Sequence, residues 1–158
     1  IFEFLDRYKD IDLIETYGMT ELGPRVSCLN LSKHPDKIGS VGKPMDKIKV
    51  KIIDKNGNEV RAKAPGEIWI WSPCRMTGYY ANPAETAKVL REGWFQTGDI
   101  GFQDEAGYLF IVGREKNIII CGGINVYPEE YENIINNFDG VDECILRING
   151  AQINIGIP

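Results

Sequence analysis

The chain has 158 residues, of which 26% are charged and 43% are hydrophobic, and its formal net charge is −5. Acidic residues outnumber Lys and Arg by 23 to 18, which argues against a nucleic-acid-binding protein, because such proteins need surplus positive charge to contact phosphates. No apolar run approaches the roughly 20 residues that a membrane-spanning helix requires, so we expect no membrane span.

The four cysteines lie far apart and form no C-x-x-C pair, and the chain has one histidine. A zinc cluster, which needs several such ligands close together, is therefore not expected. We interpret the cysteines as reduced thiols of a cytoplasmic protein, since disulfides are rare in that compartment. They are Cys28, Cys74, Cys121 and Cys144.

Both ends of the chain have the pattern of an interrupted element. The chain does not begin with Met, and residues 1–8 predict an amphipathic helix already under way. Residues 155–158 form a strand-like run without a cap or a tail. We therefore expect this polypeptide to be a fragment of a longer protein.

The first third of the chain predicts strands joined by loops. Residues 11–16 form a short apolar run that predicts a buried strand, which passes into a turn at Gly18. Residues 25–44 are expected to be rich in loops. Lysines then alternate with apolar residues over 47–52, which is the period of a half-buried strand.

The next signal is Asn56-Gly57, which predicts a type I′ hairpin turn with a returning strand over 59–61, because both central positions of that turn need positive φ. Two helices are predicted where a proline occupies the first turn: 83–90, capped by Asn82, and 128–138, which begins with acidic residues. Further strands are predicted over 66–71, 94–102 with 108–112, 117–121 with 125–127, and 143–148.

These elements predict an α+β fold that is mostly antiparallel β in its middle. The last third of the chain changes to a mixture of helix and strand. We expect the β-rich part and the final part to form two units that join near residues 114–116.

The first polar cluster, residues 17–21, directly follows an apolar strand, where proteins often display functional groups. A carboxylate next to a hydroxyl, here Glu21 and Thr20, suits a hard cation bound together with a phosphate. The ring of Tyr17 offers a flat surface for stacking on a base. The alternative is a helix cap, since Thr-Glu after a glycine turn often has that structural role.

A second cluster places Asp99 in an aromatic strand, where a carboxylate is unfavourable unless it has a partner. Its two acceptor oxygens match a vicinal diol such as that of a ribose. The predicted hairpin returns Arg114 to the same end of the sheet, beside Asp99. The alternative is a purely structural ion pair between these two residues.

In this order, the motifs resemble those of the adenylate-forming superfamily, which comprises acyl-CoA synthetases, luciferases and peptide-synthetase adenylation domains. The resemblance covers nearly the whole chain and weakens after about residue 142. The matching segments are 17–21, 39–44, 66–68, 78–80 with Pro83 and Thr86, 93–99, 113–119 and 122–130.

The resemblance implies that residues of the first cluster bind ATP or AMP. Glu21 would hold Mg²⁺, and Thr20 would contact the α-phosphate. Tyr17 would pack on the adenine, and Gly18 belongs to the same nucleotide-binding motif.

The resemblance also implies roles for the later residues. Asp99 would bind the ribose hydroxyls with the help of Arg114. Lys116 would be the hinge between a large domain and a mobile C-terminal one. Gly122 and Gly123 would lie in the loop that lines the tunnel for the pantetheine arm of coenzyme A.

The implied architecture has three parts. Residues 1–24 would end a large N-terminal α/β domain, residues 25–113 would form a β-barrel-like subdomain, and residues 114–158 would contain the hinge and the truncated start of a C-terminal lid domain. The family's phosphate loop and the catalytic lysine of adenylation would fall outside this chain. We therefore expect the chain alone to be inactive.

The implied function is that of a fragment of an AMP-forming acid–thiol ligase, which activates a small-molecule carboxylic acid with ATP as an acyl-adenylate and transfers the acyl group to coenzyme A. One alternative is an adenylation enzyme that loads a carrier protein. Another is a non-catalytic nucleotide-binding module of the same fold. The identity of the acid and the oligomeric state do not follow from this sequence.

Overall fold

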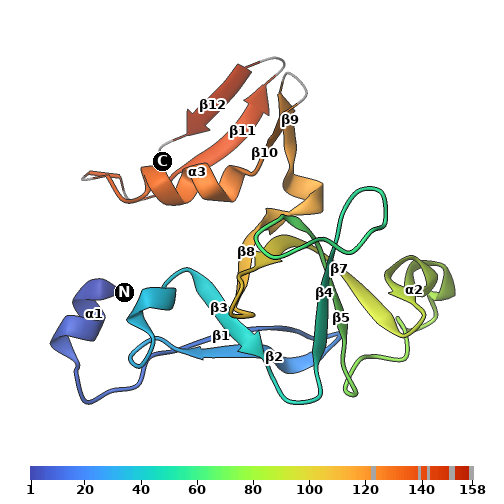
Figure 1. Cartoon of the computed structure of the whole chain (residues 1–158). Coiled ribbons are helices and arrows are strands. Elements are labelled where there is room, and N and C mark those ends of the chain that lie inside the picture. Colours follow the sequence, from blue (N-terminus) through green and yellow to red (C-terminus); the bar gives the residue numbers. More distant parts are fainter. Residues whose placement is uncertain (122–123, 139, 142, 150–151, 157–158) are drawn as a thin grey trace. The chain divides into compact units, whose positions relative to one another are not determined.

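The computed structural model describes residues 1–121, 124–138, 140–141, 143–149 and 152–156 (Figure 1). Its contacts divide the chain into two units. The first unit comprises Ile1–Thr97 and Gly101–Ile111, and the second comprises Gly98–Ile100 and Val112–Pro158. The three-part division expected from the resemblance, at residues 1–24, 25–113 and 114–158, stays a prediction.

Most of an eight-stranded sheet belongs to the first unit (Figure 1). Its strand order is β1-β2-β3-β8-β7-β5-β4, with β6 paired to β7. The sheet is mostly antiparallel, as predicted, and the described strands leave it open, whereas the resemblance implied a barrel-like form. The strands are β1 (Ile14–Met19), β2 (Gly23–Asn30), β3 (Ser40–Pro44), β4 (Lys49–Ile53), β5 (Gly66–Trp71), β6 (Leu90–Arg91), β7 (Trp94–Gln103) and β8 (Leu109–Arg114).

Short helices accompany this sheet: α1 (Phe2–Arg7), the 3₁₀ helix η1 (Pro35–Lys37) and α2 (Pro83–Val89). The predicted cap of α2 is confirmed, because Oδ1 of Asn82 accepts a hydrogen bond from the backbone N–H of Glu85 at 3.2 Å. None of the helices in the described part of the chain is long and apolar enough to cross a membrane.

The core of the first unit follows from the alternation of residues along β5. Ile68 and Ile70 are fully buried, whereas Trp69 and Trp71, which alternate with them, lie on the half-exposed face. Side chains of neighbouring elements complete the apolar cluster around the two isoleucines: Leu22, Val26, Ile52, Phe95 and Leu109. Burial of this face therefore sets the register of β5 against its neighbours, because a shift by one residue would expose the isoleucines.

The prediction of a buried strand over 11–16 is wrong. The strand β1 begins at Ile14 and continues through Gly18 to Met19, with exposed and half-buried residues alternating along it. The physical reason is its position, since among the described strands β1 is at the edge of the sheet and pairs only with β2.

The prediction that residues 25–44 are rich in loops is right only for residues 31–39, because β2 and β3 occupy the two ends of this range. Within β3, a glycine serves the close packing of strands. At Gly42, whose φ is +92°, an added Cβ would overlap the backbone carbonyl of Cys28. Glycine therefore lets β3 approach β2 at this point.

The type I′ turn predicted at Asn56-Gly57 is wrong, since Gly57 has positive φ but Asn56 does not. The Asp54 side chain fixes the turn instead: its Oδ1 accepts hydrogen bonds from the N–H groups of Asn56 and Asn58, each at 2.8 Å. The returning strand reduces to one bridge between Ile53 and Glu59, and β4 takes β5 as its partner.

The second unit contains the 3₁₀ helix η2 (Glu115–Asn117), the helix α3 (Pro128–Ile135) and two antiparallel strand pairs. Helix α3 packs against β11 and ends before the predicted residue 138. The strands are β9 (Ile119–Cys121) with β10 (Ile124–Val126), and β11 (Ile145–Asn149) with β12 (Gln152–Gly156). Cys28, Cys74 and Cys144 are free thiols, and the side chain of Cys121 lies outside the described residues.

The turn between β7 and β8 depends on the Asp104 carboxylate. Its Oδ1 accepts hydrogen bonds from the N–H groups of Ala106 and Tyr108, each at 2.9 Å, and its Oδ2 pairs with Nζ of Lys37 at 2.8 Å. Burial disfavours the charged carboxylate, but these hydrogen bonds outweigh that effect and hold the pKa of Asp104 below its ordinary value. The hydrogen bond between Lys37 and Asp104 also raises the pKa of Lys37.

We predict that Asp104→Asn lowers the melting temperature by a few degrees at neutral pH, and that Asp104→Ala lowers it further. Asn keeps an oxygen for the two N–H groups and loses only the ion pair with Lys37, whereas Ala loses both. Because the folded-state pKa of Asp104 is depressed, its stabilising effect is complete above the unfolded-state pKa of about 3.9 and is lost as the pH falls through the folded value. Thermal unfolding followed by circular dichroism should show that the difference in melting temperature between wild type and Asp104→Asn becomes smaller from about pH 5 to about pH 3. A difference that stays constant over this range contradicts the role of the Asp104 carboxylate.

Candidate functional site

The nucleotide-binding residues expected from the sequence begin at the end of β1 (Figure 1). Tyr17 and Gly18 belong to this strand, and Thr20 and Glu21 form the turn that leads into β2. The N–H of Leu22 donates to the carbonyl of Met19 at 3.1 Å and closes the turn. A strand follows and no helix does, so the alternative interpretation of Thr20-Glu21 as a helix cap is wrong.

Gly18 is required by the close approach of β2. A Cβ at this position would lie 2.7 Å from the carbonyl oxygen of Pro24, closer than real Cβ atoms approach a backbone oxygen. Any larger residue would push β1 and β2 apart just before the turn. Gly18 therefore positions Thr20 and Glu21 through the backbone and contributes no functional group of its own.

Glu21 is held by a segment that lies far away in the sequence. The hydroxyl of Tyr79 donates a hydrogen bond to Oε1 of Glu21 at 3.1 Å, and the N–H of Met76 donates to the Glu21 carbonyl at 2.7 Å. Burial of the phenol, together with this hydrogen bond, raises the pKa of Tyr79 above its ordinary value, so the hydroxyl keeps its proton at neutral pH. The sequence assigns no role to Tyr79, because it lies 58 positions from Glu21 and no local pattern connects the two residues.

The other two residues of the cluster differ in exposure. Thr20 is exposed on the turn, whereas Tyr17 is half-buried and packs against the core of the first unit. The carboxylate of Glu21 and the hydroxyl of Thr20 are oxygen donors of the kind that Mg²⁺ takes when substrate phosphates and water supply its other ligands. These two residues therefore fit a magnesium–nucleotide complex.

The predicted approach of Asp99 and Arg114 is present within the second unit. Nε of Arg114 lies 2.9 Å from Oδ1 of Asp99, and the side-chain exposure is 5% for Asp99 and 54% for Arg114. The ion pair that we gave as an alternative therefore exists, and it provides the partner that a buried carboxylate needs. The binding of a ribose by Asp99 stays a prediction.

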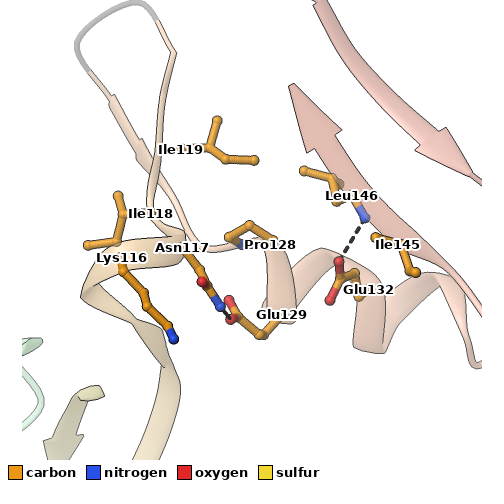
Figure 2. A pocket seen from close by; sticks show the side chains of 9 residues that line it. All are labelled: Lys116, Asn117, Ile118, Ile119, Pro128, Glu129, Glu132, Ile145 and Leu146. Atoms are coloured by element: carbon orange, nitrogen blue, oxygen red, sulfur yellow. Dashed lines mark hydrogen bonds between the residues drawn. The ribbon is translucent and has the colours of Figure 1, made fainter. Parts of the chain in front are cut away.

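Lys116 is exposed in η2, at the edge of a pocket of about 540 Å³ that lies wholly within the second unit (Figure 2). Its walls come from η2, β9, α3 and β11. The residues that line it are Lys116, Asn117, Ile118, Ile119, Pro128, Glu129, Glu132, Ile145 and Leu146.

Two glutamates of α3 hold the walls of this pocket together (Figure 2). Oε1 of Glu129 accepts a hydrogen bond from Nδ2 of Asn117 at 2.8 Å, and Oε1 of Glu132 accepts one from the N–H of Leu146 at 2.7 Å. Oε2 of Glu129 is buried without a hydrogen-bond partner among the described residues, and a Cβ at Gly113 would lie 2.6 Å from it. The segment that carries Lys116 is therefore closely packed on the first turn of α3.

The remaining expected site residues, Gly122 and Gly123, lie outside the described residues. Their proposed contact with a pantetheine arm stays a prediction. The roles of Tyr17, Lys116 and the ion-paired Asp99 in binding or movement are likewise predictions.

Comparisons with known proteins extend these observations. Residues 2–80 match the family model described as AMP-binding enzyme. A 2-succinylbenzoate–CoA ligase of Geobacillus sp. (strain WCH70) is 42% identical over 136 residues, which are 86% of this chain and 27% of that protein. A feruloyl-CoA synthase of Amycolatopsis sp. is 39% identical over 158 residues, which are 99% of this chain and 30% of that protein.

Among solved structures, the O-succinylbenzoate coenzyme A synthetase of Bacillus subtilis in complex with ATP and magnesium ion superimposes with a TM-score of 0.87 at 27% identity. The superposition covers 98% of this chain and 33% of that one. The chain thus spans less than one third of the length of the two curated relatives.

We predict that Gly18→Ala lowers the free energy of unfolding by about 1–3 kcal/mol, because β1 and β2 must separate to admit the methyl group. Thr16→Ala, at an exposed position of the same strand, is the matched control and should change stability by no more than about 0.5 kcal/mol. Urea denaturation measures both values. Equal stability of the Gly18→Ala variant and the wild type would show that the approach of Pro24 imposes no constraint.

Proposed function

This chain belongs to the AMP-binding enzyme family, and from that premise we propose that the protein containing it is an AMP-forming acid–thiol ligase. It would activate a carboxylic acid with ATP as an acyl-adenylate and transfer the acyl group to coenzyme A. The observation that carries the proposal is the turn that follows β1, where Thr20 and Glu21 present a hydroxyl and a carboxylate beside each other.

Support also comes from the relatives. Two proteins that match this chain at 42% and 39% identity are a CoA ligase and a CoA synthase. A coenzyme A synthetase of the same fold has been solved with ATP and magnesium ion. We propose a cytoplasmic location as well, for which the free thiols of Cys28, Cys74 and Cys144 are the supporting observation.

The chemistry assigns separate tasks to the residues of the turn. A carboxylate is a poor electrophile, and its attack on the α-phosphate of ATP places extra negative charge on the phosphate oxygens. Thr20 would donate a hydrogen bond from its hydroxyl to one of these oxygens. Glu21 would hold Mg²⁺, which when bound would neutralise part of the phosphate charge.

Asp99 and Arg114 would orient the nucleoside. The carboxylate oxygens of Asp99 would accept hydrogen bonds from the two ribose hydroxyls. Because Arg114 pairs with Oδ1 through Nε at 2.9 Å, it keeps the Asp99 side chain in one orientation before the nucleotide arrives. Binding then costs little side-chain entropy.

Lys116 would act at a different stage. Two successive half-reactions, adenylation and thioester formation, need two arrangements of the groups around one substrate. Lys116 lies in the short helix η2, where the chain leaves β8 and enters the small elements of the second unit. We therefore propose that rotation about its backbone separates the two half-reactions.

The test of this function is the exchange of radioactive pyrophosphate into ATP, measured with the protein that contains this chain and a panel of aliphatic and aromatic acids. We expect acid-dependent exchange, and AMP release once coenzyme A is added. Release of ADP in place of AMP, or exchange that no acid stimulates, contradicts the proposal. Faster acyl transfer to a phosphopantetheinyl carrier protein than to coenzyme A would instead support the carrier-loading alternative.

We predict that Lys116→Pro reduces thioester formation at least tenfold more than it reduces adenylation, because a proline ring fixes φ at the proposed hinge. Lys116→Ala removes the charge but keeps backbone freedom, so it is the matched control and should leave the ratio of the two rates near that of wild type. Single-turnover assays of each half-reaction provide the measurement. Equal loss of both half-reactions in the proline variant excludes Lys116 as the hinge.

A further inference from the structure

The carboxylate of Glu21 has a partner to which neither the sequence motif nor the comparisons give a role. Tyr79, in the loop between β5 and α2, donates its hydroxyl to Oε1 of Glu21 at 3.1 Å. Both residues belong to the first unit. We propose that Tyr79 is a positioning residue that fixes the Glu21 carboxylate for the magnesium ion, an inference that rests on the proposed function.

The loop of Tyr79 is attached to the Glu21 turn at two further points. The N–H of Met76 donates to the carbonyl of Glu21 at 2.7 Å, and the hydroxyl of Ser72 donates to the carbonyl of Leu22 at 3.2 Å. Ser72 and Leu22 are both buried. The backbone of the turn therefore cannot shift without the loop, and Tyr79 acts on a carboxylate whose main chain is already in place.

Tyr79 is itself held by the start of α2. The N–H of Tyr79 donates to Oγ1 of Thr86 at 2.9 Å, and the hydroxyl of Thr86 donates to the carbonyl of Asn82 at 2.9 Å. Asn82 in turn caps α2 through the N–H of Glu85. A chain of hydrogen bonds thus runs from the capped helix through Thr86 and Tyr79 to Glu21.

In this arrangement the two carboxylate oxygens of Glu21 have different partners. An isolated glutamate on an exposed turn has several side-chain rotamers, and a cation must select one of them at an entropic cost. The hydrogen bond to Tyr79 selects a rotamer in advance and leaves Oε2 to the cation. A neutral hydroxyl is suited to this task, because it holds the oxygen without competing with Mg²⁺ as a charged donor would.

The variant that tests the proposal is Tyr79→Phe, which removes the hydroxyl and keeps the ring. We expect the half-saturating Mg²⁺ concentration in pyrophosphate exchange to rise about tenfold, while excess Mg²⁺ restores most of the maximal rate. A direct readout is the binding of Mn²⁺, followed by electron paramagnetic resonance in the presence of a non-hydrolysable ATP analogue. The dissociation constant of Mn²⁺ should rise by the same factor as the half-saturating Mg²⁺ concentration.

Two controls separate positioning from a structural effect. Tyr80→Phe removes the same hydroxyl from the adjacent, fully exposed residue and should leave Mn²⁺ binding unchanged. In a Glu21→Gln background, the Tyr79→Phe change should have no further effect on Mn²⁺ binding, because no carboxylate remains to be positioned. Melting temperatures of all variants identify any loss of folding.

The outcomes distinguish this inference from the proposed function. If wild type shows acid-dependent exchange and Tyr79→Phe matches it in Mg²⁺ requirement and Mn²⁺ affinity, the positioning role is overturned and the proposed function stands. If wild type shows neither exchange nor nucleotide-dependent Mn²⁺ binding, both are overturned. A rise in Mg²⁺ requirement that Tyr80→Phe reproduces also contradicts a specific role of Tyr79.

Discussion

The ion pair between Asp99 and Arg114 sets the geometry at the start of the second unit. A carboxylate with 5% side-chain exposure is stable inside the protein only with a partner, and Nε of Arg114 supplies it at 2.9 Å. Arg114 is also the residue that precedes η2, which begins at Glu115. One interaction therefore fixes both the buried carboxylate and the point where the chain enters the proposed hinge, while Glu129 holds the other end of η2 through Asn117.

Much of the fold was predictable, because local chemistry agrees with the tertiary structure in several elements. Asn82 caps α2 as its residue type suggests, and β5 covers residues 66–71 as predicted. The predictions fail where a group from another part of the chain determines the local structure. Gly42 resembles a loop residue in sequence, yet it lies in β3, at a position where the Cys28 carbonyl leaves no room for a side chain. The Asn56 turn differs from the prediction because the Asp54 carboxylate binds its N–H groups.

The candidate site was likewise predictable only in part from the sequence. The motifs around Glu21, Asp99 and Arg114 were identified from the sequence, and the approach of Asp99 to Arg114 followed from the predicted hairpin. The hydrogen bond from Tyr79 to Glu21 could not be predicted, since no periodicity connects residues 58 positions apart. A motif thus indicates which side chains carry the chemistry, and only the folded chain shows what holds them in orientation.

The central claim is that the Asp99 carboxylate binds the ribose of ATP, and nucleotide analogues test it most directly. Calorimetry should compare the affinities of ATP and 2′,3′-dideoxy-ATP for the protein that contains this chain and for its Asp99→Ala variant. We predict that wild type prefers ATP by about 30- to 150-fold, which corresponds to roughly 2–3 kcal/mol for the lost hydrogen bonds, and that Asp99→Ala binds both nucleotides equally. An Asp99→Ala variant that retains the full preference for ATP would contradict the claim, because another residue would then recognise the ribose.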